Sequence, residues 1–229
     1  MTIHSKPPLS TQFEKADVEI QLPMTYLHFN PGKDKPLLLL FHGYEDTAAG
    51  VLRRTLTGAE HYSKFEILAP NGLFPLPVRI EQGWKQSFAW YFSDFARKHV
   101  LIPPTVAALA VARLLQQLGL EKREKLLIGF SQGGFFLPFL LPHVKNIKKL
   151  IAVGAGYREE DYPAHLPIPL DALHGETDQI IPLEKAKEGF QKLKIKNPQG
   201  QFYSFAGLGH SMNAESRAYL KKIILGAFP

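Results

Sequence analysis

A serine in a glycine-flanked motif is the residue of this chain best suited to do chemistry. Residues 129–133 have the sequence Gly-Phe-Ser-Gln-Gly, a G-x-S-x-G pattern that follows the apolar run 125–128. A strand that ends at such a motif leads through a sharp turn into a helix and leaves the serine hydroxyl exposed above the sheet. Bulkier residues at the two glycines would collide with the strand or the helix. The pattern predicts that Ser131 is a nucleophile.

An acid and a histidine follow the serine in the order that a catalytic triad needs. Asp178 comes after the apolar run 168–173, and His210 comes after the run 201–205. All three residues are therefore expected just past the carboxyl ends of strands, where open α/β sheets place their functional groups. The order serine, aspartate, histidine is that of the α/β-hydrolases.

These three residue types fit acyl transfer. A serine hydroxyl is a weak nucleophile at neutral pH and needs a base. Histidine titrates near neutral pH, so His210 can take the proton and return it to the leaving group, while Asp178 would fix the imidazole tautomer. The oxyanion needs two backbone N–H donors. We expect them at Gln132, next to the nucleophile, and at Tyr44, in the loop after the apolar run 36–41.

The chain resembles the small α/β-hydrolases of the phospholipase/carboxylesterase family, which includes the acyl-protein thioesterases. The resemblance begins at about residue 37 and continues to the end of the chain, and Gly-Phe-Ser-Gln-Gly-Gly at 129–134 is more specific than the bare serine motif. The other matching strings are Leu40-Phe41-His42-Gly43, Ala69-Pro70-Asn71-Gly72, Ala89-Trp90-Tyr91, His174 through Asp178, and Gly209-His210-Ser211.

The resemblance implies an α/β-hydrolase fold: a mostly parallel, twisted sheet with helices on both faces. It also implies hydrolysis of carboxylic esters or thioesters without a metal or organic cofactor. Trp90 lies in the family's aromatic motif and is the candidate for a substrate-binding wall. One departure concerns the loop after His42-Gly43: the family tends to have glycine at the position of Glu45, which bears on the conformation of the oxyanion loop.

Several of these residues have other possible roles. Ser131 could be only a helix N-cap, and Asp178 could cap a helix near Pro182. Glu176 and Asp171 are rival acids. The Asp-x-x-Ile-Pro spacing that follows Asp178 resembles that of the family and favours this residue. Of the remaining histidines, His174 is expected to be a packing residue, and His42 is expected to make a structural hydrogen bond in the oxyanion loop.

Composition agrees with one compact domain over residues 1–229. Apolar residues make up 45% of the chain and charged residues 21%, which is ordinary for a globular protein. The absence of cysteine excludes disulfides and thiolate catalysis.

No apolar run reaches the ~18 residues that a membrane span needs, and residues 1–8 do not resemble a signal peptide. These features predict a cytoplasmic protein. The net charge of +6 is scattered and accompanies no nucleic-acid motif, so no nucleic-acid partner is expected.

Apolar runs alternate with helical patterns along the chain, which predicts a mostly parallel sheet. The run 17–21 is expected to pair with 25–30 as an opening antiparallel pair, and residues 1–12 are expected to be poorly ordered. Further strands are predicted at 36–41, 65–68, 125–130, 149–153, 168–173 and 201–205, and helices at 105–118, 133–141, 183–193 and 214–227. Pro138 conflicts with the second of these helices because proline removes a helical hydrogen bond.

Two connections bear on the substrate. Only about fifteen residues separate the strands that end near Val153 and begin near Ile168, which leaves no room for a large lid. The connection 71–104 is rich in aromatic residues, either as a wall for an acyl group or as core beneath a loop. We expect a serine carboxylesterase for small to medium acyl chains. An acyl thioesterase or lysophospholipase with the same triad, or an inactive hydrolase fold that only binds a ligand, are the alternatives.

Overall fold

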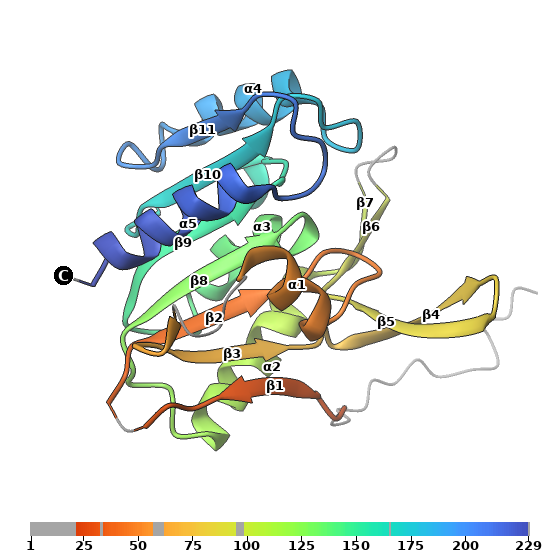
Figure 1. Cartoon of the computed structure of the whole chain (residues 1–229), viewed down its shortest axis with the longest axis vertical. Coiled ribbons are helices and arrows are strands. Elements are labelled where there is room, and N and C mark those ends of the chain that lie inside the picture. Colours follow the sequence, from red (N-terminus) through yellow and green to blue (C-terminus); the bar gives the residue numbers. More distant parts are fainter. Residues whose placement is uncertain (1–21, 33, 57–61, 95–98, 165, 229) are drawn as a thin grey trace, which may run out of the picture.

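A seven-stranded sheet forms the centre of the computed structural model, which describes residues 22–32, 34–56, 62–94, 99–164 and 166–228 (Figure 1). The spatial order of the strands is β1-β3-β2-β8-β9-β10-β11. Strand β1 is antiparallel to β3, and the other neighbours are parallel. The strands are β1 (Tyr26–Phe29), β2 (Leu37–Phe41), β3 (Glu66–Pro70), β8 (Lys125–Phe130), β9 (Ile147–Val153), β10 (Leu170–Gly175) and β11 (Phe202–Phe205).

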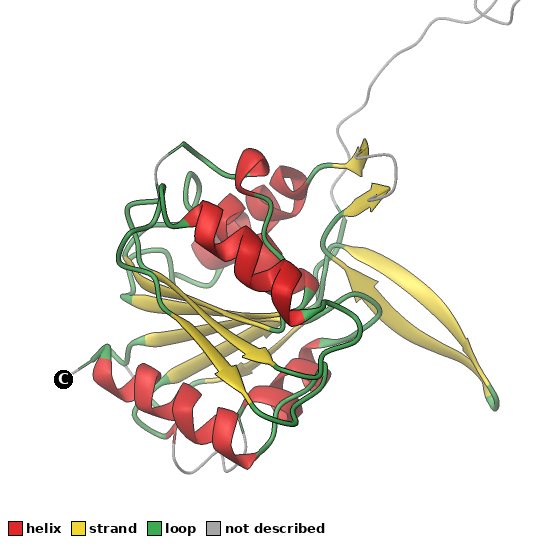
Figure 2. Cartoon of the chain, turned by 90° about the horizontal axis from the view of Figure 1, so that it is seen from above, coloured by secondary structure: helices red, strands yellow, loops and turns green. Residues whose placement is uncertain are grey.

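Helices cover both faces of the sheet, as Figure 2 shows from above. One core, shared with α2 (Pro104–Gln117), α3 (Gln132–Phe136) and α4 (Leu183–Leu193), receives Leu37, Leu39 and Phe41 from β2. The other core, shared with α1 (Ala48–Thr55) and α5 (Ala214–Gly226), receives Leu38 and Leu40. Successive strand residues point to opposite faces, so a strand buried on both sides must be apolar throughout. The predicted α/β-hydrolase architecture is confirmed.

Most predicted elements of the sheet are found close to their predicted bounds. Strand β8 and helix α4 coincide with the predicted ranges, β9 begins two residues before its predicted start, and β10 begins and ends two residues after its predicted bounds. The predictions for residues 1–12 and for a strand at 17–21 lie outside the described residues. The partner of β1 on its inner side is β3, through Tyr26 opposite Pro70 to Phe29 opposite Ile67.

The single helix predicted over 133–141 is wrong because Pro138 divides it. The α-helical part α3 ends at Phe136, and a 3₁₀ helix, η3 (Leu137–Leu140), follows with Pro138 in its first turn. Residues in the first turn of a helix need no N–H partner within that helix, so proline is accommodated there without a lost hydrogen bond.

The aromatic connection 71–104 forms two β-hairpins that were not predicted. Strands β4 (Phe74–Ile80) and β5 (Gly83–Ala89) pair along their whole length, and β6 (Phe92–Asp94) pairs with β7 (His99–Ile102). The β4–β5 hairpin projects away from the sheet (Figures 1 and 2) and leaves Trp84 70% exposed near its tip. Its base packs inward, where Phe74 contacts Phe92 with ring centres 5.7 Å apart.

In the described part of the connection between β9 and β10, residues 154–164 and 166–169, the only helix is the 3₁₀ turn η4 (Glu159–Asp161). A connection of this length leaves no room for a large lid. None of the helices in the described part of the chain has both the length and the apolar composition to cross a lipid bilayer.

Candidate active site

Ser131 occupies the sharp turn between β8 and α3 that the sequence predicted. Its backbone has φ 52° and ψ −116°, a strained conformation for a residue with a side chain. The Ser131 N–H donates to the carbonyl oxygen of Val153 at 2.8 Å, and its own carbonyl accepts from the N–H groups of Gly134 and Phe135. These bonds tie the turn to the neighbouring strand and to the first turn of the helix.

The glycines of the motif are required by close backbone contacts. A Cβ atom at Gly129 would lie 2.3 Å from the carbonyl oxygen of Gly133, and one at Gly133 would lie 2.3 Å from that of Phe41. Both distances are far below van der Waals contact. Glycine at these positions therefore allows β8, α3 and the end of β2 to approach one another closely beneath Ser131.

Asp178 is the one acid, of the three weighed from the sequence, whose side chain contacts His210. Its Oδ2 atom lies 2.7 Å from Nδ1 of His210, and its Oδ1 atom accepts the N–H groups of Ile180 and Ile181, both at 2.9 Å. Glu176 instead accepts from the Ser204 hydroxyl, and Asp171 pairs with Lys149. The Asp178 carboxylate is buried, so its two backbone donors and the imidazole replace the hydrogen bonds of water.

His210 lies next to the strand end that carries Ser131. Its ring centre is 5.0 Å from that of Phe130, the residue before the serine. A Cβ atom at Gly154, which follows the Val153 partner of Ser131, would lie 3.5 Å from the His210 ring. Ser131, Asp178 and His210 thus converge at the carboxyl ends of β8, β10 and β11, the edge where the sequence placed them.

The loop after β2 is fastened by His42, which is completely buried. Its Nδ1 atom donates to the carbonyl oxygen of Gly43 at 2.6 Å, and its Nε2 atom accepts the N–H of Gly72 at 2.8 Å. The pKa of His42 is lowered to about 4 because burial disfavours the charged imidazole. The hydrogen bond to Gly43 and the charge of Asp46 raise the pKa, but by less than burial lowers it. The imidazole is therefore neutral at neutral pH, as one donor and one acceptor require. The predicted structural hydrogen bond of His42 is present.

Trp90 is 0% exposed, a position that does not favour its predicted role as a substrate wall. Its indole Nε1 donates to the His42 carbonyl oxygen at 2.9 Å, and its ring stacks on Phe136. Its backbone N–H donates to the side chain of Gln132, which in turn donates to the Tyr91 carbonyl oxygen. Trp90 thus packs beneath the site and joins the loop after β2 to the first residue of α3.

The two predicted oxyanion donors belong to the two segments that this network joins, Tyr44 to the loop after β2 and Gln132 to the start of α3. Within the described part of the chain, the backbone N–H groups of Tyr44 and Gln132 donate to no other protein group. A Cβ atom at Gly43 would lie 3.3 Å from Cβ of Ser131, so the residue before Tyr44 approaches the serine directly. Glu45 adopts φ 57°, the left-handed conformation that favours glycine. Glu45 thus adopts the backbone conformation that suits the glycine expected at this position from the resemblance.

The sequence did not indicate an ion pair that braces this loop. Nη1 of Arg54 in α1 lies 2.7 Å from Oδ2 of Asp46, whose carbonyl oxygen accepts the N–H of Phe88. The same guanidinium stands 4.4 Å above the centre of the Phe130 ring, close enough for a cation–π contact. Arg54 lies in the last turn of a short helix that was not predicted, and Asp46 lies just before that helix, so their spacing carried no signal.

Comparisons with known proteins bear on the family and the fold of the chain. A family model described as Phospholipase/Carboxylesterase matches residues 29–225. A search of curated proteins found no match.

Three solved structures illustrate the likeness in fold. Esterase PE8 is 20% identical, with a TM-score of 0.64 over 91% of this chain and 100% of its own. Acyl-protein thioesterase 2 of Zea mays is 18% identical, with a TM-score of 0.64 over 90% of this chain and 99% of its own. A carboxylesterase of Mesorhizobium loti is 17% identical, with a TM-score of 0.66 over 93% of this chain and 100% of its own.

Replacing Glu45 with glycine is expected to stabilise the protein. The substitution removes a side chain from a left-handed residue, which relieves about 1 kcal/mol or more of strain, and a more flexible unfolded chain offsets part of that gain. We expect the free energy of unfolding in urea to rise by about 0.5–1 kcal/mol. Glu45→Ala, which keeps the Cβ atom, should give no such gain. A loss of stability in Glu45→Gly would show that the Glu45 side chain, rather than its backbone, matters.

Removing the charge of Arg54 is expected to loosen the loop. Arg54→Met keeps an unbranched apolar side chain but removes the guanidinium that contacts Asp46 and Phe130, and it should lower the free energy of unfolding by about 1 kcal/mol. Asp46→Asn should cost a similar amount, and the double variant should cost less than the sum because both changes break one ion pair. The adjacent, exposed Arg53 provides the matched control, Arg53→Met. Additive losses in urea unfolding would contradict the pairing.

Proposed function

Because the chain belongs to the phospholipase/carboxylesterase family, we propose that it is a serine hydrolase that cleaves carboxylic esters of small to medium acyl chains. Ser131 is the nucleophile, His210 the general base and Asp178 the acid that orients it. The observation that carries the proposal is the 2.7 Å contact between Asp178 and His210, beside the strained turn of Ser131.

The reaction begins with attack of the Ser131 Oγ atom on the ester carbonyl carbon. Because Nδ1 of His210 is engaged by Asp178, its other ring nitrogen takes the serine proton as the bond to carbon forms. The carbonyl π electrons move to oxygen, and the N–H groups of Tyr44 and Gln132 stabilise the resulting oxyanion. The oxyanion collapses, the C–O bond to the alcohol breaks, and His210 gives its proton to the departing oxygen.

Water then removes the acyl group from Ser131. His210, again neutral, takes a proton from water as the hydroxide oxygen bonds to the acyl carbon. A second oxyanion forms and collapses, the bond to Ser131 Oγ breaks, and His210 returns the proton to the serine. The products are a carboxylic acid and an alcohol, and the enzyme is unchanged.

The same sequence of steps would cleave a thioester, with a thiol as the leaving group. The short connection between β9 and β10, without a large lid, supports small and medium acyl chains in an accessible site. The acyl-protein thioesterase among the similar structures keeps the thioesterase alternative open. An inactive, ligand-binding hydrolase is the alternative from another class.

A fluorophosphonate probe should label Ser131. Such a probe transfers its phosphonyl group to an activated serine, so peptide mass spectrometry should find the adduct on the peptide that contains residues 129–133. His210→Gln should slow labelling by a factor of about 100 or more, because the base is lost. Ser204 is an exposed serine on β11, and Ser204→Ala is the matched control. In this variant the probe should label Ser131 at the original rate. Label on another serine, or full ester hydrolysis by Ser131→Ala, would overturn the proposal.

A substrate panel should separate the alternatives. We expect p-nitrophenyl acetate, butyrate and octanoate to give the highest kcat/KM values, with palmitate, palmitoyl-CoA and lysophosphatidylcholine lower by a factor of about 10 or more, since an accessible site gives a long chain little added burial. Ser131→Ala measures the uncatalysed background for each compound. A higher kcat/KM for the thioester or the lysolipid would replace the carboxylesterase assignment, and ligand retention without turnover would support the inactive alternative.

A further inference from the structure

His174 is a buried histidine that the proposed mechanism does not use. It lies on β10, is 1% exposed, and its ring stacks on that of Phe202 with the ring centres 6.0 Å apart. Its Nε2 atom lies 2.8 Å from the carbonyl oxygen of Ile181. A carbonyl oxygen only accepts hydrogen bonds, so Nε2 carries the proton and donates it. His174 is therefore more than the packing residue expected from the sequence, because it joins β10 to the segment that follows Asp178.

The other ring nitrogen of His174 keeps the imidazole neutral. Its Nδ1 atom is buried and has no hydrogen-bond partner among the described residues. A second proton at Nδ1 would be buried without an acceptor, which costs free energy. Burial disfavours the charged form and lowers the pKa of His174, while the bond to Ile181 and the charge of Asp178 raise the pKa by less. The ring is thus a neutral donor fixed in the Nε2–H tautomer.

Ile181, the residue that His174 holds, is itself bonded to Asp178. Its N–H donates to Oδ1 of Asp178 at 2.9 Å, and its carbonyl oxygen accepts from His174. The Nε2 atom of His174 also lies 3.6 Å from Oδ2 of Asp178, the oxygen that contacts His210. This distance is too long for a hydrogen bond, but it places the positive end of the Nε2–H dipole beside the carboxylate.

Asp178 is buried in a segment that is otherwise open to solvent. The residues on either side of it, 176–177 and 179–180, are exposed. The bond between His174 and Ile181 fixes the end of this segment, just before α4 begins. A buried donor therefore limits how far the exposed turn, and the carboxylate within it, can move.

We propose that His174 is a positioning residue, which holds the Ile181 carbonyl group and so keeps the Asp178 carboxylate in contact with Nδ1 of His210. The catalytic consequence of this role rests on the proposed function. If the turn relaxed, Asp178 would no longer fix the orientation of the His210 ring, and the imidazolium that forms when Ser131 attacks would lose its stabilisation. The loss would fall on the chemical step rather than on substrate binding.

Nitrogen-15 NMR of the unmodified chain tests the tautomer of His174. We expect the Nε2–H form, because the Ile181 carbonyl oxygen needs a donor at that nitrogen. This measurement requires neither a substrate nor a variant. An Nδ1–H tautomer would overturn the proposal, since Nε2 would then have no proton to donate to Ile181.

Two substitutions separate the donor of His174 from its packing. His174→Phe keeps an aromatic ring against Phe202 but has no donor, whereas the side-chain amide of His174→Gln offers an N–H donor. In His174→Phe, we expect the downfield proton NMR signal of His210 Nδ1–H to be lost. For p-nitrophenyl butyrate, kcat should fall about tenfold or more with KM nearly unchanged. His174→Gln should keep the signal and a kcat within about threefold of the original.

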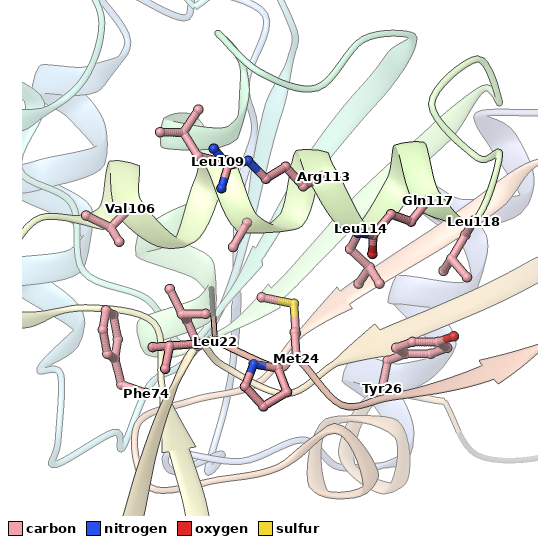
Figure 3. A pocket seen from close by; sticks show the side chains of 13 residues that line it. Leu22, Met24, Tyr26, Phe74, Val106, Leu109, Arg113, Leu114, Gln117 and Leu118 are labelled. Carbon is pink, nitrogen blue, oxygen red and sulfur yellow. The ribbon is translucent and has the colours of Figure 1, made fainter. Parts of the chain in front are cut away.

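Leu114→Ala is the control for a general loss of stability. Leu114 is 6% exposed and lines an apolar groove between α2 and the chain that leads into β1 (Figure 3), and none of the residues proposed for catalysis lines this groove. The cavity that the substitution leaves should lower Tm without changing kcat or the His210 Nδ1–H signal.

Two results would overturn the proposal. One is a retained His210 Nδ1–H signal in His174→Phe, and the other is loss of this signal in Leu114→Ala to the same extent as in His174→Phe. Neither NMR measurement depends on turnover. If the chain proved unable to hydrolyse esters, the signals would still decide whether His174 positions Asp178, so the two failures can be told apart.

Discussion

The left-handed backbone of Ser131 is the constraint on which the arrangement of the site depends. A residue with a side chain avoids φ 52° unless its surroundings impose that conformation, at a cost of about 1–3 kcal/mol. Here the surroundings are the hydrogen bonds to Val153, Gly134 and Phe135 and the close packing permitted by Gly129 and Gly133. The strained conformation of Ser131 is thus maintained by contacts with the central strands of the sheet, which are the most completely buried part of the fold.

A set of buried polar contacts holds the loop after β2 in place beside the start of α3. Gln132 and Trp90 connect the start of α3 to the carbonyl oxygen of His42, and His42 connects that loop to Gly72. Every one of these contacts is between neutral groups. Burial would make a charged imidazole costly, and the depressed pKa of His42 keeps it uncharged. A neutral network can position two loops at the edge of the sheet without placing a competing charge beside the nucleophile.

Much of this fold could be predicted because its strands are buried on both faces. The continuous apolar runs of β2 and β8 admit few other structures, and the Ser131 motif located the turn between strand and helix. Helix α1 was missed because it is short and contains a glycine, and its N-cap at Thr47 follows a loop rather than an apolar run. The β4–β5 hairpin was missed because two prolines and many exposed residues hide its alternation.

Within the site, sequence alone could propose residues but could not decide between neighbours of the same type. Asp171 lies near the start of β10, and Glu176 and Asp178 follow its end. What distinguishes the three acids is their partners, Lys149, Ser204 and His210, each at least 22 residues away. Trp90 is a different case: its motif made it the candidate for a substrate wall, and the contacts that the structure shows for it are to the interior. The pairing of Arg54 with Asp46 and Phe130 joins three elements at once, and no local pattern encodes it. Residues that bond within one turn can be predicted from spacing, whereas those that join separate strands become evident only when the sheet has brought their ends together.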